Sequence, residues 1–202
     1  MATIRPYAAT DLEALYRVCL ATGWSGEDAS ARYEDPRLVG EVYAAPYGVL
    51  RGDCALVLED AAGVGGYMLG APDTAAFEER LEAEWWPPLR ARYPDPGHVP
   101  RAERTPDQAL CALIHHPRRT PPAVTGPYPA HLHIDLLPRF QGRGLGRALI
   151  DRWLQRMGAL GVRGVHLGVS GANHRAIRFY RAYGFEEPWP GAADKLFAMK
   201  LP

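Results

Sequence analysis

The sequence predicts a single α/β (α+β) domain over residues 1–202, and three observations support this fold class. A chain of 202 residues with 47% hydrophobic and 23% charged side chains can bury one full core and needs no second domain. Apolar runs at 54–59 and 64–69 flank a short turn with a glycine, the pattern of an antiparallel hairpin. Residues 131–169 have the pattern of a strand, a glycine-rich loop, a helix and a second strand.

The N-terminal elements follow from apolar spacing and helix caps. Thr3–Arg5 is prone to form a strand, and Asp11 precedes an apolar set at helical spacing that reaches Leu20. Residues 23–52 are rich in Gly, Pro, Asp and Tyr, which predicts a surface loop with at most a short helix near 26–33. We therefore expect a strand, a helix and a long loop before the hairpin.

The middle of the chain combines a helix with a proline-rich segment. Asp73 is expected to cap a helix that Pro87 and Pro88 interrupt. Residues 93–129 carry many prolines and few periodic apolar positions except at 108–114. This segment is therefore expected to be an irregular insertion with a helical turn or two.

The C-terminal part alternates strands with helices. On a predicted strand at 131–136, apolar residues occupy one face, and the other face carries His131, His133 and Asp135. The further elements expected are an amphipathic helix at 145–160, a strand at 162–169, a helix at 172–183 that Gly184 closes, and a strand at 195–201.

Charge and cysteine content exclude several classes of protein. The 23 basic and 23 acidic side chains cancel, so we expect neither a nucleic-acid partner nor a membrane partner. The 3 cysteines form no CxxC pair, which argues against a disulfide framework and a zinc knuckle and favours a reducing cytoplasm. No signal peptide and no spanning stretch of about 18 apolar residues is evident.

A glycine-rich loop between a predicted strand and a predicted helix is the most informative feature. The loop consists of Gln141, Gly142, Arg143, Gly144, Leu145 and Gly146, with Arg147 directly after it. Glycines let the backbone approach a diphosphate, and the unpaired N–H groups of the first helical turn point at an anion. The two arginines add positive charge for phosphate oxygens. The loop therefore predicts a pyrophosphate-binding cradle.

Two other phosphate-binding patterns do not fit this loop. A dinucleotide fingerprint needs a glycine where the chain has Arg147 or Leu149, and the following strand ends in Ser170 instead of an acidic residue. A P-loop needs a lysine followed by a hydroxyl residue, and the loop has neither.

The remaining pattern, Q-x-x-G-x-G, resembles the pyrophosphate loop of the GNAT superfamily, and the resemblance extends beyond it. Leu136-Leu137-Pro138 resembles the strand before the loop, and the family's downstream helix is matched by Val169-Ser170, Asn173, Ala176, Phe179-Tyr180 and Gly184-Phe185. Three further segments resemble the C-terminal acetyltransferase-like domain of O-GlcNAcase and its free-standing bacterial relatives, namely Tyr16–Leu20, Tyr67–Gly70 and Ile134-Asp135.

The resemblance implies a GNAT fold, with a mixed central sheet flanked by helices and two strands that splay apart around acetyl-CoA. The backbone at Leu136 and Leu137 would meet the acetyl and pantetheine portion, and residues 141–146 the pyrophosphate. Asn173 would meet the pantetheine arm and Tyr180 the thioester sulfur. The implied activity is N-acetyl transfer from acetyl-CoA to a primary amine by direct attack on the thioester.

Acyl transfer to an amine needs a neutral amine, a stabilised oxyanion and a proton for the departing thiolate. A substrate ammonium with a pKa of about 10 must lose its proton, and Asp135 or His133, directly or through water, is the candidate base. A backbone N–H near Leu136 could stabilise the oxyanion. Tyr180 is the candidate acid, although core packing alone would also explain that tyrosine.

Several alternatives remain open from the sequence. His131, His133 and Asp135 form an H-x-H-x-D pattern that could bind zinc, although the cradle leads us to expect no metal cofactor. A non-catalytic acyl-CoA-binding or protein-interaction module would keep the same fold. Trp85-Trp86 and Tyr93 could wall an acceptor site, but core packing is the simpler interpretation.

The acceptor amine is not specified by the sequence. A small molecule, a peptide or a protein lysine all satisfy the predicted chemistry, and a homodimer is compatible with the chain. The insertion at 93–129 is where we expect acceptor specificity to reside, because scaffolds vary their loops more than their cores.

Overall fold

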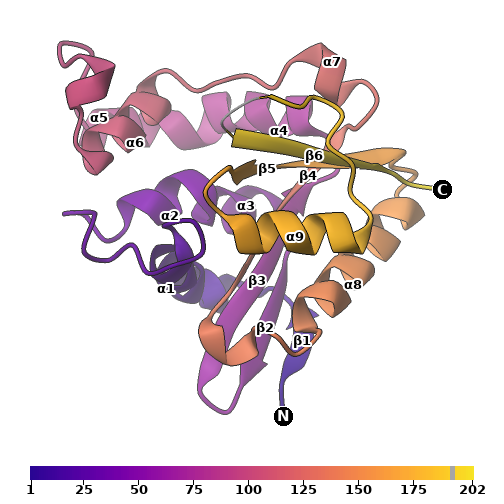
Figure 1. The fold of residues 1–202 in the computed structure, drawn as a ribbon. Coiled ribbons are helices and arrows are strands. Elements are labelled where there is room, and N and C mark those ends of the chain that lie inside the picture. The colour runs from indigo at the N-terminus through magenta and orange to yellow at the C-terminus, as the bar shows by residue number, and fades with distance from the viewer. Residues whose placement is uncertain (192–193) are drawn as a thin grey trace.

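The computed structural model describes residues 1–191 and 194–202, and these form a mixed sheet with helices on both faces (Figure 1). Six strands run in the order β1-β2-β3-β4-β5-β6, and all neighbours are antiparallel except the parallel pair β4 and β5. The strands are β1 (Thr3–Pro6), β2 (Leu56–Asp60), β3 (Gly63–Ala71), β4 (Ala130–Leu136), β5 (Gly164–Ser170) and β6 (Asp194–Lys200).

The helices cover the two faces of the sheet as separate layers. They are α1 (Leu12–Thr22), α2 (Leu38–Tyr43), α3 (Ala45–Arg51), α4 (Thr74–Arg80), α5 (Trp86–Arg92), α6 (Pro106–His115), α7 (Pro122–Thr125), α8 (Leu145–Ala159) and α9 (His174–Tyr183). A π-helical turn (Leu81–Trp85) joins α4 to α5, and short 3₁₀ turns lie at 9–11, 52–54, 101–103 and 138–140.

Alternation along the strands builds one core on each face. Tyr67 and Leu69 of β3 point into a cluster with the helices α1 to α6, whereas Met68 points to the opposite cluster with α8 and α9. Trp153 of α8 is fully buried there, and its Nε1–H donates to the carbonyl of Cys54 at 2.9 Å. The predicted mixed sheet with flanking helices is therefore confirmed.

Local patterns placed most elements correctly. Asp73 caps α4, where its Oδ1 accepts from the Ala76 N–H at 3.0 Å. Gly184 ends α9 at a φ of 117°, the left-handed conformation that glycine adopts without steric cost. The hairpin forms as β2 and β3, and the strand expected at 131–136 forms as β4.

The prediction of a loop over residues 23–52 is wrong, because this segment contains α2 and α3. Gly40 lies inside α2 against the ring of Tyr16, and Gly48 lies inside α3, where it also contacts α1. Pro46 sits in the first turn of α3, where a missing N–H removes no helical bond. These residues serve close helix packing here, whereas the sequence alone indicated turns.

The short helix expected near 26–33 does not form, and a polar network anchors the residues that follow it. The backbone N–H groups of Glu34 and Asp35 donate to the Asp107 carboxylate at 3.1 and 3.0 Å. Tyr93 donates its hydroxyl hydrogen to Asp35 Oδ2 at 2.8 Å. The two segments for which irregular structure was expected therefore bind each other.

The expected interruption at Pro87 and Pro88 does not occur. Both prolines fall in the first turn of α5, and the π-helical turn directly before them continues the chain from α4. Within the insertion at 93–129, α6 is a full helix of 10 residues opened by a capping box between Thr105 and Gln108. The insertion is thus more regular than its proline content indicated.

Strands β4 and β5 stay paired only at their beginnings. Their pairs in the described residues are Ala130 with Val165 and His131 with His166, after which the strands separate. The other edge of β4 remains paired with β3 as far as Leu136. The backbone of β4 that faces β5 therefore borders a cleft.

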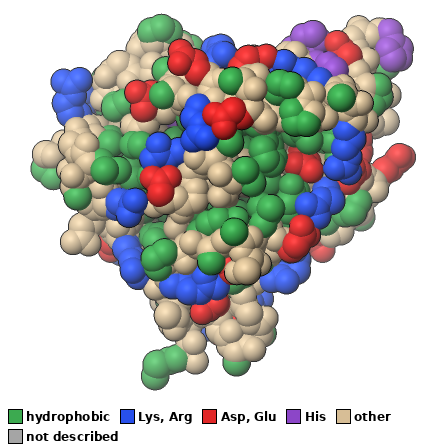
Figure 2. Space-filling model, turned by 180° about the vertical axis from the view of Figure 1, so that it is seen from behind, with side chains coloured by type: hydrophobic (Ala, Val, Ile, Leu, Met, Phe, Trp, Pro, Cys, Tyr) green, Lys and Arg blue, Asp and Glu red, His purple; other side chains and the backbone are tan. Residues whose placement is uncertain are grey.

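The molecular surface carries charges of both signs. Figure 2 shows basic and acidic side chains interspersed over the rear face, in keeping with a formal net charge of +0. Within the described part of the chain, none of the helices has both the length and the apolar character needed to cross a membrane.

Gly40 provides a test of the packing between α1 and α2. A Cβ at this position would meet the Tyr16 ring, so Gly40→Ala should lower the free energy of unfolding by about 1–3 kcal/mol. Urea denaturation measures the change. The matched control is Gly158→Ala in α8, where nothing lies within 4 Å of the added Cβ, so a gain of about 0.5–1 kcal/mol is expected. Equal effects at the two glycines would contradict the close contact.

Candidate active site

The cleft between β4 and β5 opens into three adjoining cavities. The cradle cavity, of about 410 Å³, is lined by the glycine-rich loop. The middle cavity, of about 220 Å³, shares Asp135, Asn173 and Tyr180 with it. The far cavity, of about 440 Å³, shares Tyr43 and His133 with the middle one. The three cavities therefore form one series along the cleft, from the glycine-rich loop to the far cavity.

The glycine-rich loop has the geometry of an anion-binding cradle. Gly142 and Gly144 have φ values of 68° and 74°, and no atom lies within 4 Å of a Cβ built on either. Gly144 is the N-cap of α8, and Ala148 is the first residue whose N–H bonds back to the helix, through the Gly144 carbonyl. The preceding N–H groups have no partner in the helix, and the helix dipole favours an anion beside them.

Gln141 anchors the cradle to β4 and to the opposite wall. Its Nε2 donates to the Leu136 carbonyl at 2.6 Å, and its Oε1 accepts from Arg175. Arg175 also donates to the Gly26 carbonyl at 3.3 Å, so its guanidinium links three segments around the cradle cavity. Neither Arg175 nor Gly26 was predicted. The sequence contained two signals for these residues. One was the Ser25-Gly26 turn, and the other was the position of Arg175 two residues after Asn173.

The predicted cofactor residues do not all reach the cavities. Leu136, Leu145, Gly146 and Arg147 line the cradle cavity, together with the residues already described. Leu137 does not line it, and its backbone N–H donates to the Gly65 carbonyl at 2.8 Å. Arg143 also lies outside the lining and donates to the Arg139 carbonyl at 3.1 Å. Arg147 places its guanidinium 4.9 Å from the centre of the Tyr183 ring.

Tyr180 and Asn173 of α9 lie between the cradle and middle cavities. The Tyr180 ring packs against Phe185 and Phe197 and is 7% exposed. Burial, and then the charge of Asp135, raise the pKa of the Tyr180 hydroxyl, so the group keeps its proton at neutral pH. None of the side-chain hydrogen bonds among the described residues uses this hydroxyl. Asn173 Oδ1 caps α9 by accepting from the Ala176 N–H at 3.0 Å.

Asp135 lies at the same junction, opposite Tyr67 in the pairing of β3 with β4. The Tyr67 hydroxyl donates to Asp135 Oδ2 at 2.6 Å. Burial raises the pKa of the Asp135 carboxyl, and the Tyr67 hydrogen bond partly opposes that shift. A carboxylate with a raised pKa is a better proton acceptor than an exposed one. Asp135 therefore combines exposure to two cavities with increased basicity.

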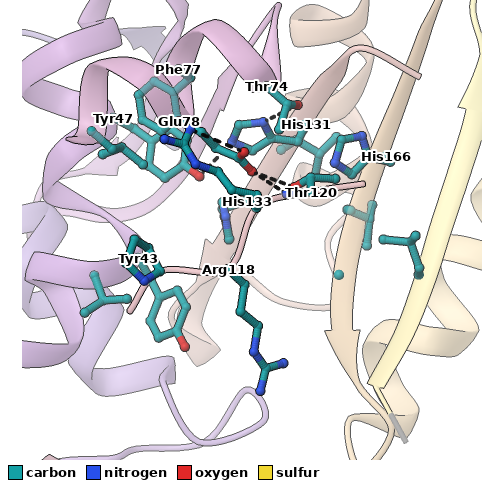
Figure 3. A pocket seen from close by; sticks show the side chains of 18 of the residues that line it. Tyr43, Tyr47, Thr74, Phe77, Glu78, Arg118, Thr120, His131, His133 and His166 are labelled. Carbon is teal, nitrogen blue, oxygen red and sulfur yellow. Dashed lines mark hydrogen bonds and ion pairs between the residues drawn. The ribbon is translucent and has the colours of Figure 1, made fainter. Parts of the chain in front are cut away.

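Three imidazoles line the far cavity (Figure 3), of which His131 and His166 are buried and His133 is half-buried. Thr74 donates its hydroxyl hydrogen to the Pro129 carbonyl, so His131 must donate from Nδ1 to Thr74 and accept at Nε2 from the Tyr47 hydroxyl. Both nitrogens of His131 are thus used. Burial lowers the pKa of His131, His133 and His166, that of His133 to about 4, so the rings are neutral at pH 7.

The zinc site that the H-x-H-x-D pattern allowed finds no support in the structure. His131, His133 and Asp135 do share one face of β4, but the nitrogens of His131 are committed to hydroxyls and Asp135 to Tyr67. Within residues 1–191 and 194–202, no group of three or more His, Cys, Asp or Glu side chains is arranged to hold a metal ion.

Aromatic residues form much of the far cavity, and the sequence indicated only some of them. Trp86 is 5% exposed and belongs to the core, as packing predicted, while it also lines the cavity. Tyr43 and Tyr47 come from the segment for which a loop was expected, and Phe77 comes from α4. Tyr43 ends α2 and Tyr47 lies in α3, with the non-helical Ala44 between the two helices, so no single helical spacing in the sequence indicated this pair.

Comparison with known proteins agrees with this geometry. The model of the Acetyltransferase (GNAT) family matches residues 72–185. The crystal structure of SsHAT is 40% identical, with a TM-score of 0.90 and an alignment that covers 98% of each chain. Mycothiol acetyltransferase from Frankia casuarinae is 35% identical over 127 residues, which are 57% of this chain and 36% of that protein.

The resemblance to O-GlcNAcase is also found. Protein O-GlcNAcase from Rattus norvegicus is 24% identical over 182 residues, which are 90% of this chain. Those residues are 20% of the rat protein, so the chain spans only a fifth of the length of that relative. The family model, the close structural match and the splayed sheet together show that this chain belongs to the GNAT acetyltransferase family.

Proposed function

We propose that this protein is an N-acetyltransferase that moves the acetyl group of acetyl-CoA to a primary amine. The observation that carries the proposal is the order of groups along the cleft. An anion cradle lies at one end, a protonated tyrosine and a carboxylate lie at the middle, and a separate cavity lies beyond them. Two substrates that meet at a thioester carbonyl require this order.

The cradle cavity suits acetyl-CoA, which supplies the acyl group as a thioester. The free N–H groups at the start of α8 would bind the pyrophosphate, and Arg147 would add charge. The unpaired edge of β4 would take the amide groups of the pantetheine arm as a strand would. A phosphate-bearing chain therefore fits the lining residues, and no metal is needed to hold it.

Proton transfer at the junction would involve two residues. Asp135 would accept a proton from the incoming ammonium, directly or through water, because burial makes this carboxylate more basic. Tyr180 would donate its hydroxyl proton to the departing sulfur, since its raised pKa keeps it protonated until then. His133, neutral and next to the same junction, would place no positive charge of its own beside the amine.

A reducing compartment such as the cytoplasm is also proposed. Cys19, Cys54 and Cys111 are all buried and unpaired thiols. Burial raises the pKa of the Cys19 thiol to about 12, so this cysteine beside the middle cavity is unreactive at neutral pH.

Gly144 tests the cradle. Gly144→Glu should abolish measurable binding of CoA, because it adds a side chain at a left-handed position and a negative charge where phosphate would lie. Calorimetric titration with CoA measures this. Gly144→Asn is the control for backbone strain, since Asn tolerates the left-handed region, and it should retain more affinity. Equal affinity of Gly144→Glu and the native chain, with an unchanged circular dichroism spectrum, would refute the cradle.

Tyr180 and Asp135 test the chemistry. Tyr180→Phe and Asp135→Asn should each lower kcat by about ten-fold or more, with CoA affinity within about two-fold, because each removes one proton transfer. Thiol release with a panel of amines measures the rate. The control is Tyr183→Phe, whose hydroxyl donates to Asp151 outside the cavities. Tight CoA binding with no acetylation of any amine by the native chain would favour a binding module.

The neutral His133 ring predicts how stability depends on pH. Because the pKa of His133 falls to about 4, from about 6.5 in an unfolded chain, only the unfolded state binds this proton between those values. The free energy of unfolding should therefore decrease as the pH falls from 6.5 to 4. His133→Gln should make that decrease shallower in urea titrations at several pH values, because the variant lacks the titrating ring. An unchanged slope in His133→Gln would contradict a His133 ring that stays neutral in the folded protein.

A further inference from the structure

The far cavity contains one carboxylate, and that carboxylate already has partners. Glu78 Oε1 accepts from the backbone N–H of Thr120 at 3.0 Å and from its hydroxyl at 2.7 Å. Its Oε2 lies 3.9 Å from Arg119. The side chain is 16% exposed, so these contacts replace most of its solvent. Glu78 therefore holds the 117–120 segment against α4 and leaves little negative charge for a ligand.

Arg118 also lines the far cavity, but unlike Glu78 it has no charged partner among the described residues. It lies between Pro117 and the anchored Thr120, so its backbone is fixed close to the wall of the far cavity. Across the described ranges 1–191 and 194–202, no hydrogen bond or ion pair to its guanidinium is found. In Figure 3 its side chain extends beside Tyr43, with the guanidinium directed away from the three labelled imidazoles. The cavity thus has one unmatched positive charge on the side of Tyr43, a residue that also lines the middle cavity.

The other titratable groups of the far cavity do not change this balance. Burial lowers the pKa of all three imidazoles, so they carry no charge at pH 7. The tyrosine hydroxyls are neutral as well, because the ordinary pKa of a tyrosine is about 10. Burial raises the pKa of Tyr47 above that value. With Glu78 matched by Arg119, the charge left for a ligand is that of Arg118.

The rest of the far cavity is aromatic and limited in size. Tyr47 stacks on Phe77 with ring centroids 4.6 Å apart, and Trp86 completes this wall. A volume of about 440 Å³ is at the lower end of the range for small-molecule sites. The walls therefore suit the apolar body of a small molecule better than a long, fully solvated chain.

We propose that the acceptor is a small zwitterionic amine with an apolar side group, such as a hydrophobic α-amino acid, whose carboxylate binds Arg118. The amine would then lie beside His133 and face Asp135, and the apolar group would lie between Tyr47 and Trp86. In an α-amino acid the carboxylate and the amine are attached to the same carbon. Both groups can therefore lie at one end of the cavity, the carboxylate at Arg118 and the amine at His133. This inference rests on the proposed acetyl transfer.

The test compares each amino acid with its own amide. L-phenylalanine and L-phenylalaninamide, and L-leucine and L-leucinamide, are assayed by thiol release at saturating acetyl-CoA for the native chain and Arg118→Gln. The ratio of kcat/KM for acid over amide should fall by about ten-fold or more in Arg118→Gln, because a charge-assisted hydrogen bond is lost for the acid alone. The amines of an amino acid and of its amide differ in basicity, but this difference is the same for the native chain and for Arg118→Gln. It therefore cancels when the two ratios are compared.

Two variants complete the design. Arg118→Glu should lower the ratio further, since it repels the carboxylate. The matched control Arg101→Gln removes an exposed arginine that does not line the far cavity, and it should leave the ratio unchanged. CoA affinity should be equal in all variants, which separates an acceptor effect from unfolding.

The outcomes distinguish the two proposals. An unchanged ratio in Arg118→Gln, or faster acetylation of lysine peptides and polyamines with no effect of Arg118, overturns the acceptor class and leaves the acetyltransferase proposal standing. CoA binding without acetylation of any amino acid or amide also overturns the acceptor class. Failure to bind CoA, or to acetylate any amine at all, overturns the proposed function and the acceptor class together.

Discussion

The early separation of β4 and β5 is the constraint on which the site depends. After two residue pairs the strands diverge, although β4 remains bonded to β3 on its other edge. Backbone N–H and C=O groups that leave a sheet ladder must find other partners, and here they border a cleft. A ligand with amide groups can take the place of the missing strand, while side chains from both strands meet it. The separation thus creates a cleft within the sheet itself.

Burial divides the cleft into regions of different charge. The cradle end is positive through the start of α8 and its arginines. At the junction, burial raises the pKa of both Asp135 and Tyr180. The shift makes the Asp135 carboxylate a stronger base and keeps the Tyr180 hydroxyl protonated. Beyond it, burial keeps the imidazoles neutral, so that the matched Glu78 and the unmatched Arg118 determine the charge of the far cavity. Under the proposed function, phosphate, proton transfer and acceptor would occupy separate surroundings within one cleft.

The errors of the sequence-based prediction have a common cause. Glycine and proline were interpreted as turn residues over 23–52 and at Pro87, but Gly40 allows two helices to approach and Pro87 occupies a first helical turn. Both residue types have two structural uses, and the choice between them depends on the neighbour in space. The regular alternation of β4 and the Asp73 cap were predicted correctly because each is decided within a few residues.

By itself the sequence determined the features whose physics is local. The cradle needs only a strand, glycines with left-handed φ and a helix start in succession, and strand alternation alone places His133 and Asp135 on one face. Only the tertiary structure decided the far cavity and the contacts of Arg175. The far cavity combines side chains from α2, α3, α4, the 117–120 segment and β4, which are distant along the chain. No local pattern in the sequence encodes such a set, because only the packing of these helices against the sheet brings the side chains together.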